Sequence, residues 1–456
     1  MKLASLDSIA LPPRRFEANP KATLWLLVLC AALVLQGAAI SNSVVFAAPI
    51  LAVLLVAAAV DIPLVPAVGG LLLARVLVDD LSSEASRYSS SFNLSGAIAV
   101  GLILLATGLL IRRRESLATA TLIGLWLAAW TVVAAGYEGF STVVLREGIR
   151  ELSIAAVAFI AYASRGSLRL PVAARLVQVA GAYSALLALY QCASHTGTTV
   201  GGFERAFGTF SHPNSAAVFF AIAALVSLWR YLDQGRRRLD LLFTVLFVAA
   251  NVVTFSLAGF ITLLVMFASF GVMRSGARRL KLAMVFFVAL LVATFLATPL
   301  GSERVHSEST SAATGKAGEG SSLAWRFERW EALIPEWEKA PVFGQGLGSK
   351  VSEESAGSYT SRLPHSEYVR YLVETGVLGV ALLIAGLVVL LRRLGRQRVG
   401  GDTGNVAACA TALTVGLLVN GLAANTLIYT PAAYAAALII GAALAAGRPQ
   451  ARRVAR

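Results

Sequence analysis

One histidine stands where a long apolar segment begins, in the run Leu-Pro-His-Ser-Glu-Tyr that ends at Tyr368. This residue, His365, is one of only four histidines in 456 residues. An imidazole with a pKa of about 6.5 can take a proton from a sugar hydroxyl near neutral pH. A single histidine is more often a structural hydrogen-bonding residue, so this residue alone leaves both roles open.

Two arginines in separate polar stretches are the second chemical feature. Arg205 precedes a run that includes His212 and Asn214, and Arg326 lies four residues before Trp330, one helical turn away. If the two stretches converge, the arginines form a suitable fork for a diphosphate, because each donates charge-assisted hydrogen bonds worth about 1.5–3 kcal/mol. The proline between the histidine and the asparagine also fits ordinary capping of a helix start.

A glycine-rich run follows the second arginine. It reads Pro-Val-Phe-Gly-Gln-Gly-Leu-Gly and contains Gly344 and Gly346. Alternating glycines allow tight turns that expose backbone N–H groups, and such a loop can cradle phosphate. A plain turn is the more frequent outcome of this spacing, and both alternatives stay open.

The elements that must position these residues are membrane helices. The chain is 57% hydrophobic and 14% charged, and a soluble domain of this composition could not cover its surface with polar groups. Its apolar residues form blocks long enough to cross a bilayer core, which takes about 20 helical residues. No strand-length alternation recurs. We therefore predict an all-α, polytopic transmembrane bundle of 12–14 spans, at 24–41, 43–60, 62–79, 94–111, 118–135, 150–163, 171–191, 214–230, 240–255, 258–273, 280–298, 370–391, 405–424 and 428–446.

The net charge of +14 is distributed as expected for a membrane protein with both termini in the cytoplasm. When the spans alternate sides, the basic runs fall on the N-terminal side, as the positive-inside rule requires. Because the charge is spread over separate short loops, a nucleic-acid partner is disfavoured. The basic runs are Arg14, Arg15 and Lys21, then 112–114, 236–238, 274–281, 392–398 and 448–456.

Ionisable residues are scarce inside the predicted spans, where they would mark a transport path. Arg75 is the clearest case, and Asp61, Arg150 and Glu151 lie near span ends. A transporter usually carries such charges in repeated halves, and we find no internal repeat. Polar residues gather instead in two outward stretches, 193–213 and 299–369, although a flippase or transporter remains the alternative from another class.

The longer outward stretch is predicted to have a mobile part and a helical part. Residues 307–322 are small and polar, which is typical of a mobile loop. An amphipathic helix should follow, kinked or restarted at Pro335 and capped by Ser321 or Ser322. It would lie on the outer leaflet or pack over the bundle. The apolar face of this helix comprises Leu323, Phe327, Trp330, Ile334 and Trp337.

Three cysteines lie in or beside apolar spans and suggest neither a disulfide framework nor a metal site.

The predicted organisation has five parts. The parts are a cytoplasmic tail (1–22), transmembrane helices (23–298), a large extracytoplasmic loop (299–369), further transmembrane helices (370–447) and a basic cytoplasmic tail (448–456).

Across roughly 200–380 the sequence resembles the O-antigen ligase and O-antigen polymerase superfamily of bacterial envelope glycosyltransferases. Three motifs in the expected order carry the resemblance. They are Arg205 with Gly208, Thr209, Phe210, Pro213 and Asn214; Arg326 and Trp330 with Pro341, Gly344 and Gly346; and His365, Ser366 and Tyr368 with Glu374, Gly376 and Gly379. The chain departs from the family at Leu257, where Thr-x-Ser-Arg-x-Gly usually has an arginine.

The resemblance implies a GT-C-like, inverting and metal-independent enzyme of a bacterial inner membrane, without a cofactor, whose site faces the periplasm. Its donor would be a polyprenyl-diphosphate-linked glycan, and its acceptor a glycan, lipid or protein, with ligase and polymerase differing only in acceptor. Arg205 and Arg326 would bind the diphosphate, and His365 would deprotonate the acceptor hydroxyl. Further substrate-binding candidates are Arg329, Trp330, His212, Asn214, Tyr368, Glu367, Gly344 and Gly346.

Overall fold

A computed structural model describes residues 64–79, 94–113, 142–164, 166–200, 203–235, 237–274, 278–314, 323–349, 364–398 and 401–447. The spans predicted at 24–41, 43–60 and 118–135, both tails and the serine cap predicted near 321–322 lie outside these residues. Every other predicted span coincides with a helix in the structure.

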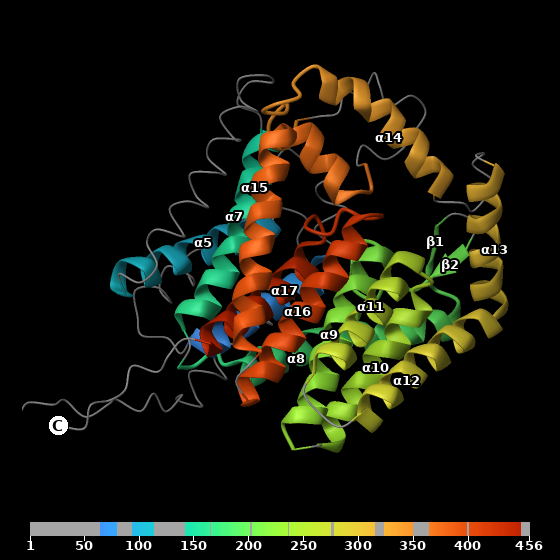
Figure 1. The fold of residues 1–456 in the computed structure, drawn as a ribbon, viewed down its shortest axis with the longest axis horizontal. Helices are drawn as coiled ribbons and strands as arrows, with labels where there is room; N and C mark the ends of the chain where they lie inside the picture. The colour runs from blue at the N-terminus through green and yellow to red at the C-terminus, as the bar shows by residue number, and fades with distance from the viewer. Residues whose placement is uncertain are drawn as a thin grey trace, which may run out of the picture.

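The described part of the chain is all-α, as predicted, apart from one short hairpin (Figure 1). The strands β1 (Thr198–Val200) and β2 (Phe203–Arg205) are antiparallel. The helices are α3 (Leu64–Leu77), α5 (Leu94–Arg113), α7 (Thr142–Ala163), α8 (Leu170–Ser194), α9 (Pro213–Asp233), α10 (Arg238–Val253), α11 (Leu257–Met273), α12 (Arg278–Ala297), α13 (Pro299–Thr314), α14 (Leu323–Glu338), α15 (Glu367–Gln397), α16 (Gly401–Gly421) and α17 (Thr430–Ala446).

Several helices have the length and composition to cross a membrane. Within the described residues, α8, α9, α15 and the 404–421 part of α16 meet both criteria, and a bent pair within α12 and α13 raises the total from four to five. The helices α3, α11 and α17 and the 95–107 part of α5 are apolar but shorter. The chain is therefore a multi-pass membrane protein.

The helix α9 forms the centre of the bundle. All its residues from Pro213 to Arg230 are buried, and α8, α10, α11, α16 and α17 pack around it. Close approach depends on small residues: a Cβ added at Gly259 would lie 2.2 Å from the Cβ of Ala217. Outward positions on α8, α10, α12 and α15 instead expose large apolar side chains, as lipid-facing surfaces do.

The two ends of the bundle differ in charge. At one end, Arg274 and Asn405 both bind Asp233, which joins the end of α9, the end of α11 and the start of α16. The basic turns after α9, α11 and α15 belong to this end, which lies away from α14 in Figure 1. The basic turns that the charge pattern assigned to one side of the membrane therefore lie at one end of the bundle.

One expectation about the long outward stretch was wrong, and another is narrowed. Residues 307–314 belong to α13 and are not a loop, since Thr298 caps this helix by accepting a hydrogen bond from Gly301 N at 3.1 Å and Pro299 occupies its first position. The helix α14 continues through the exposed Pro335, so the predicted restart does not occur and the kink stays a prediction.

The inward face of α14 is offset from the predicted aromatic face. Phe327 and Ile334 are 55% and 49% exposed, whereas the buried residues are Arg326, Arg329, Leu333 and Glu336. Leu333 packs against Val373 of α15, so this side of α14 faces the bundle. The apolar period identified the helix correctly, but the side of α14 that packs against the bundle is the one that carries the arginines.

Candidate functional site

Four segments meet at the end of the bundle opposite the basic turns. They are the hairpin and loop before α9, the joint between α10 and α11, the inward face of α14 and the residues before α15. Each of the three sequence motifs contributes to this end.

Arg205 is buried and rigidly held at the end of β2. Its Nε donates to the carbonyl oxygen of Thr254 at 2.9 Å, and one terminal nitrogen donates to Asn214 Oδ1 at 2.7 Å. The next residue, Ala206, donates its amide to Val253 O at 3.2 Å. The hairpin was not predicted, and it is the element that carries this arginine to the α10–α11 joint.

The loop after Arg205 is anchored from below by side chains of α8. Gln191 Oε1 accepts hydrogen bonds from the amides of Phe207 and Gly208, at 3.0 and 2.8 Å. Gly208 has a φ of +62°, and a Cβ there would lie 2.3 Å from Ser184 Oγ. Only glycine fits this turn without strain, because L side chains rarely adopt that backbone conformation.

Asp79, just after α3, anchors the same loop from the other side. Its carboxylate accepts hydrogen bonds from the amide and the hydroxyl of Ser211, at 3.0 and 2.8 Å. Arg75, noted above as an intramembrane charge, forms an ion pair with Asp79 at 2.6 Å. Arg75 therefore supports the loop and needs no separate transport role.

His212 and Asn214 form the start of α9, as the proline predicted. Nδ1 of His212 accepts from Asn214 N at 3.0 Å, so the neutral ring carries its proton on Nε2. Burial, followed by the charges of Arg205, His365 and Arg326, lowers the pKa of His212 to about 3. His212 thus has the arginines of two motifs and the histidine of the third as electrostatic neighbours.

The helix α14 holds the His365 segment with two tryptophans. The indole of Trp330 donates to Pro364 O at 2.7 Å, and the Trp325 and His365 rings meet edge to face at 5.1 Å between centroids. Arg326 is buried and Arg329 is 0% exposed on the same helix.

His365 has two unusual properties. Its φ of +49° is rare for a residue with a side chain, and such strain concentrates at functional positions. Burial, together with the positive charges of Arg326 and Arg329, lowers the pKa of His365 to about 4. The imidazole is therefore neutral at physiological pH, which is the form that a general base requires.

Glu367 and Tyr368 follow His365 but point away from it. Tyr368 donates its hydroxyl to Leu418 O at 2.8 Å. Glu367 accepts from Leu427 N at 2.9 Å and forms an ion pair with Arg370 at 2.8 Å. Both residues tie the start of α15 to α16 and to the segment after it.

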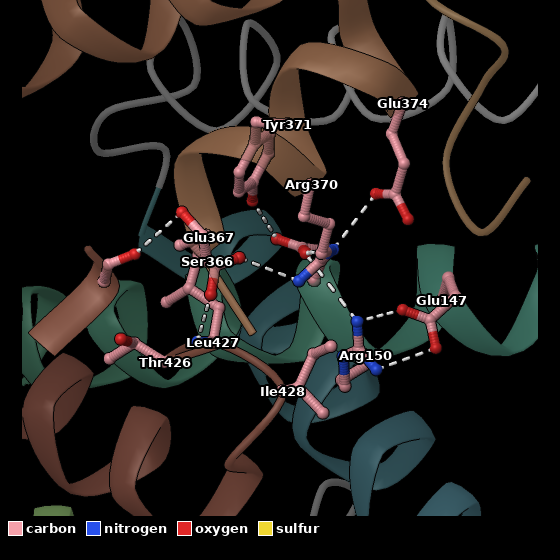
Figure 2. A network of polar contacts seen from close by, with 12 residues as sticks. Glu147, Arg150, Ser366, Glu367, Arg370, Tyr371, Glu374, Thr426, Leu427 and Ile428 are labelled. Atoms are coloured by element: carbon pink, nitrogen blue, oxygen red, sulfur yellow. Dashed lines mark hydrogen bonds and ion pairs between the residues drawn. The ribbon is translucent and has the colours of Figure 1, made fainter. Parts of the chain in front are cut away.

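Arg370 is the centre of a buried ion-pair network between α15 and α7 (Figure 2). It contacts Glu151 at 2.5 Å and Glu374 at 3.1 Å, in addition to Glu367. Tyr371 donates to Glu151 at 2.8 Å. Glu151, predicted near a span end, is thus a partner of two α15 side chains.

The glycine-rich run forms backbone hydrogen bonds across a break in α15. We call this contact between residues 341–346 and residues 373–378 the clasp. The break is at Gly376, with φ +62° and ψ −172°. Gln345 and Gly346 donate their amides to the carbonyls that end the first half of the helix, Val373 O and Glu374 O, at 2.9 and 2.8 Å. The amide of Gly344 donates to Ala340 O at 2.8 Å. This is the plain-turn alternative, with the glycine amides engaged by the protein itself.

Tyr429, at the start of α17, is a site residue that the motifs did not indicate. Burial raises the pKa of its hydroxyl, and the charges of Arg326 and Arg205 act on it. The only sequence signal was a short polar joint between two apolar spans. Leu257, at the position of the family arginine, is half-buried and follows Ser256, whose hydroxyl donates to Asn214 Oδ1 at 2.8 Å.

A bundle of membrane helices with buried arginines and histidines at one end defines a multi-pass membrane protein with a polar site away from its basic turns. The family model described as O-Antigen ligase matches residues 242–384 of the chain. This confirms the resemblance to the O-antigen ligase superfamily over the part that includes Arg326 and His365, and supports a function of ligase or polymerase type. None of the curated proteins matches the chain.

Proposed function

We propose that this protein transfers a glycan from a polyprenyl-diphosphate carrier to an acceptor hydroxyl on the periplasmic face of a bacterial inner membrane. The observation that carries the proposal is the environment of His212. The charges of Arg205, His365 and Arg326 all act on this one side chain. Groups that must act on one substrate have to lie within reach of one another. Three motifs separated in sequence here contribute to a single neighbourhood.

The arginines would bind the diphosphate of the donor. The Nε and one terminal nitrogen of Arg205 are engaged by Thr254 and Asn214, so its planar guanidinium is oriented before any substrate arrives. Arg326 and Arg329 are buried on the inward face of α14. Positive charge in a site shielded from water stabilises the negative charge that develops on a departing diphosphate.

His365 would act as the base toward the acceptor. The acceptor oxygen forms a bond to the anomeric carbon while the bond from that carbon to the diphosphate oxygen breaks. The diphosphate leaves with the bonding electrons, and the acceptor proton passes to His365. A neutral imidazole is required for this step, and burial beside Arg326 and Arg329 favours that form by lowering its pKa. The positive charge needed by the leaving group would come from arginine side chains.

The test uses purified protein, a polyprenyl-diphosphate-linked glycan and candidate acceptors, with release of polyprenyl diphosphate as the readout. His365→Ala should lower the turnover rate by about 10²–10⁴-fold, the usual contribution of a general base. Arg326→Ala should weaken donor binding and slow release together. The matched controls are His195→Ala, an 83% exposed histidine beside Glu204, and Arg393→Ala at the basic end.

The outcomes separate the competing functions. Release that survives both His365→Ala and Arg326→Ala contradicts the site assignment. Movement of intact lipid-linked glycan across a vesicle membrane without bond cleavage favours a flippase. Transfer to a second lipid-linked glycan, with no transfer to a lipid core or protein acceptor, identifies a polymerase of the same superfamily.

A further inference from the structure

The proposed base His365 has a backbone conformation that needs support from its surroundings. Its φ of +49° lies in the left-handed region, which residues with a side chain rarely adopt. Such a conformation persists only when the surrounding structure holds it in place. His365 belongs to no helix or strand, so the support has to come from contacts of the segment around it.

The peptide before His365 is held by Trp330 of α14. The indole Nε1–H of this residue donates to the carbonyl oxygen of Pro364 at 2.7 Å. That oxygen lies in the plane of the peptide bond between Pro364 and His365. Because φ of His365 is a rotation relative to this plane, a hydrogen bond that fixes the plane fixes one side of the rotation.

The chain after His365 is held by α15 and by the end of α16. Ser366 is the N-cap of α15, and its hydroxyl donates to Gly421 O at 3.4 Å. The next residue, Glu367, donates its amide to Ala424 O at 3.1 Å. With the following residues attached to these helices, the hydrogen bond from α14 acts on a histidine that is already held on its other side.

The ring of His365 contacts the same helix. It meets the Trp325 ring edge to face, with 5.1 Å between the centroids and 74° between the ring planes. Trp325 and Trp330 are five residues apart on α14. One helix therefore contacts both the imidazole of the proposed base and the peptide that orients it.

We propose that Trp330 is a positioning residue, whose indole N–H fixes the peptide before His365 and so keeps the imidazole where an acceptor hydroxyl reaches it. The proposal rests on the proposed function and deepens it, because it gives Trp330 a role through His365. An indole has one N–H and no acceptor, and Pro364 O already uses that N–H. Hydrogen bonding to substrate, as the sequence suggested for Trp330, is thereby replaced by a bond within the protein.

The helix α14 also supplies a matched control. Trp337, two turns further along, donates its indole N–H to another proline carbonyl, Pro341 O, at 3.2 Å. That oxygen belongs to the clasp and also accepts from Val377 N at 2.9 Å. Trp330→Phe and Trp337→Phe each remove one indole–carbonyl hydrogen bond from α14, but only the first bond acts on the residue next to His365.

The first measurement is the kinetics of polyprenyl diphosphate release by full-length purified protein. Trp330→Phe should lower kcat by about tenfold or more, and by less than His365→Ala, because the base is displaced but present. KM for the lipid-linked donor should stay within about twofold of wild type, since the arginines are unchanged. Trp337→Phe should match wild type in both constants. Thermal unfolding establishes that each variant is folded.

The second measurement is the pH profile of kcat/KM between pH 4.5 and 7.5, which a loss of stability alone would not shift. Among the described residues, the charges of Arg326 and Arg329 act on His365 and, after burial, lower its pKa to about 4. Its titratable neighbour His212 stays neutral over this range. Wild type should therefore show little loss of rate in acid. An imidazole displaced from α14 has a pKa closer to about 6.5, so the rate of Trp330→Phe should already fall between pH 7 and 5.

The third measurement requires no turnover. Diethyl pyrocarbonate acylates neutral imidazoles, and peptide mass spectrometry compares its attachment to the half-buried His365 with that to His195, which is 83% exposed. At pH 7, Trp330→Phe should be labelled at His365 about threefold faster or more than wild type, because local opening exposes the ring. Trp337→Phe should be labelled at the wild-type rate.

Equal kcat, pH profile and labelling in Trp330→Phe and wild type would overturn the role of Trp330 while leaving the transferase proposal intact. A change confined to the donor KM would also overturn it, since Trp330 would then act on the substrate directly. Equal losses in Trp330→Phe and Trp337→Phe would contradict it by indicating a general effect on α14. A wild-type protein that releases no polyprenyl diphosphate would overturn the proposed function, and the role of Trp330 in the reaction with it.

Discussion

At the scale of single residues, the proposed base His365 has a pKa well below the ordinary value for histidine. Burial, followed by the charges of Arg326 and Arg329, lowers the pKa of His365 to about 4, and His212 has an even lower pKa of about 3. Both values lie below the ordinary histidine value of about 6.5. The site therefore keeps two neutral imidazoles among positively charged arginines.

The lowered pKa predicts how stability changes with acid. Between pH 6.5 and about 4 His365 is protonated in the unfolded chain but stays neutral in the folded protein. Its contribution to the free energy of unfolding is therefore fully present above pH 6.5 and falls as the pH drops through this window. For His365 alone the loss approaches about 2–3 kcal/mol at pH 4. Thermal unfolding of wild type and His365→Asn at pH 7, 5.5 and 4.5 checks this. The difference between the two proteins should shrink or reverse in acid, and parallel curves would contradict the low pKa.

At the scale of elements, the clasp between the glycine-rich run and the broken helix α15 joins the arginine helix to the histidine. Residues 341–346 satisfy carbonyls that end the first half of α15, and amides of the second half: Val377 and Leu378 donate to Pro341 O and Val342 O at 2.9 and 3.2 Å. A helix break normally leaves such groups unsatisfied. The second and third motifs are thus two sides of one backbone contact.

Gly376→Ala tests this clasp. An added Cβ would lie 2.3 Å from Val342 O, at a φ of +62° that alanine disfavours. We expect a loss of stability of about 1–3 kcal/mol, and lower activity because α14 shifts relative to His365. The control is Gly386→Ala on the same helix, where a Cβ meets nothing within 4 Å and should be neutral or slightly stabilising. Equal melting temperatures for the two variants would show that the clasp tolerates a side chain.

At the scale of the whole molecule, the Arg370 network ties α7 to the C-terminal helices. Glu151 precedes the central helix α9 in the chain, and its partner Arg370 follows that helix. The side chain of Arg370 is only 2% exposed. A buried guanidinium with three carboxylate partners joins these parts. The start of α15, which follows His365, is thereby attached to α7.

Arg370→Met should therefore destabilise the protein by about 3–5 kcal/mol, because it leaves Glu151, Glu367 and Glu374 buried without their counter-charge. Arg393→Met, an exposed change on the same helix, should have an effect within about 0.5 kcal/mol. Unfolding by heat or denaturant in the same detergent compares the two. Adding Glu374→Gln to Arg370→Met should recover part of the loss, and a failure to recover any would argue against the electrostatic cause.

What the sequence by itself determined is what depends on local pattern. Apolar runs of span length and the bias of basic loops predicted the multi-pass bundle, and Pro213 marked the start of α9 with His212 as its cap. The motifs also indicated His365 and the arginines. Each of these signals comes from residues that are neighbours in the chain, where hydrophobic period, proline geometry and charge placement act directly.

Only the tertiary structure decided which groups face one another. It turned the arginine face of α14 inward while Phe327 and Ile334 stayed exposed, directed Glu367 and Tyr368 away from His365, and closed the glycine run on the break at Gly376. These outcomes depend on hydrogen-bond directions and packing between segments far apart in the chain, and a local period carries no information about the partner that a face will meet.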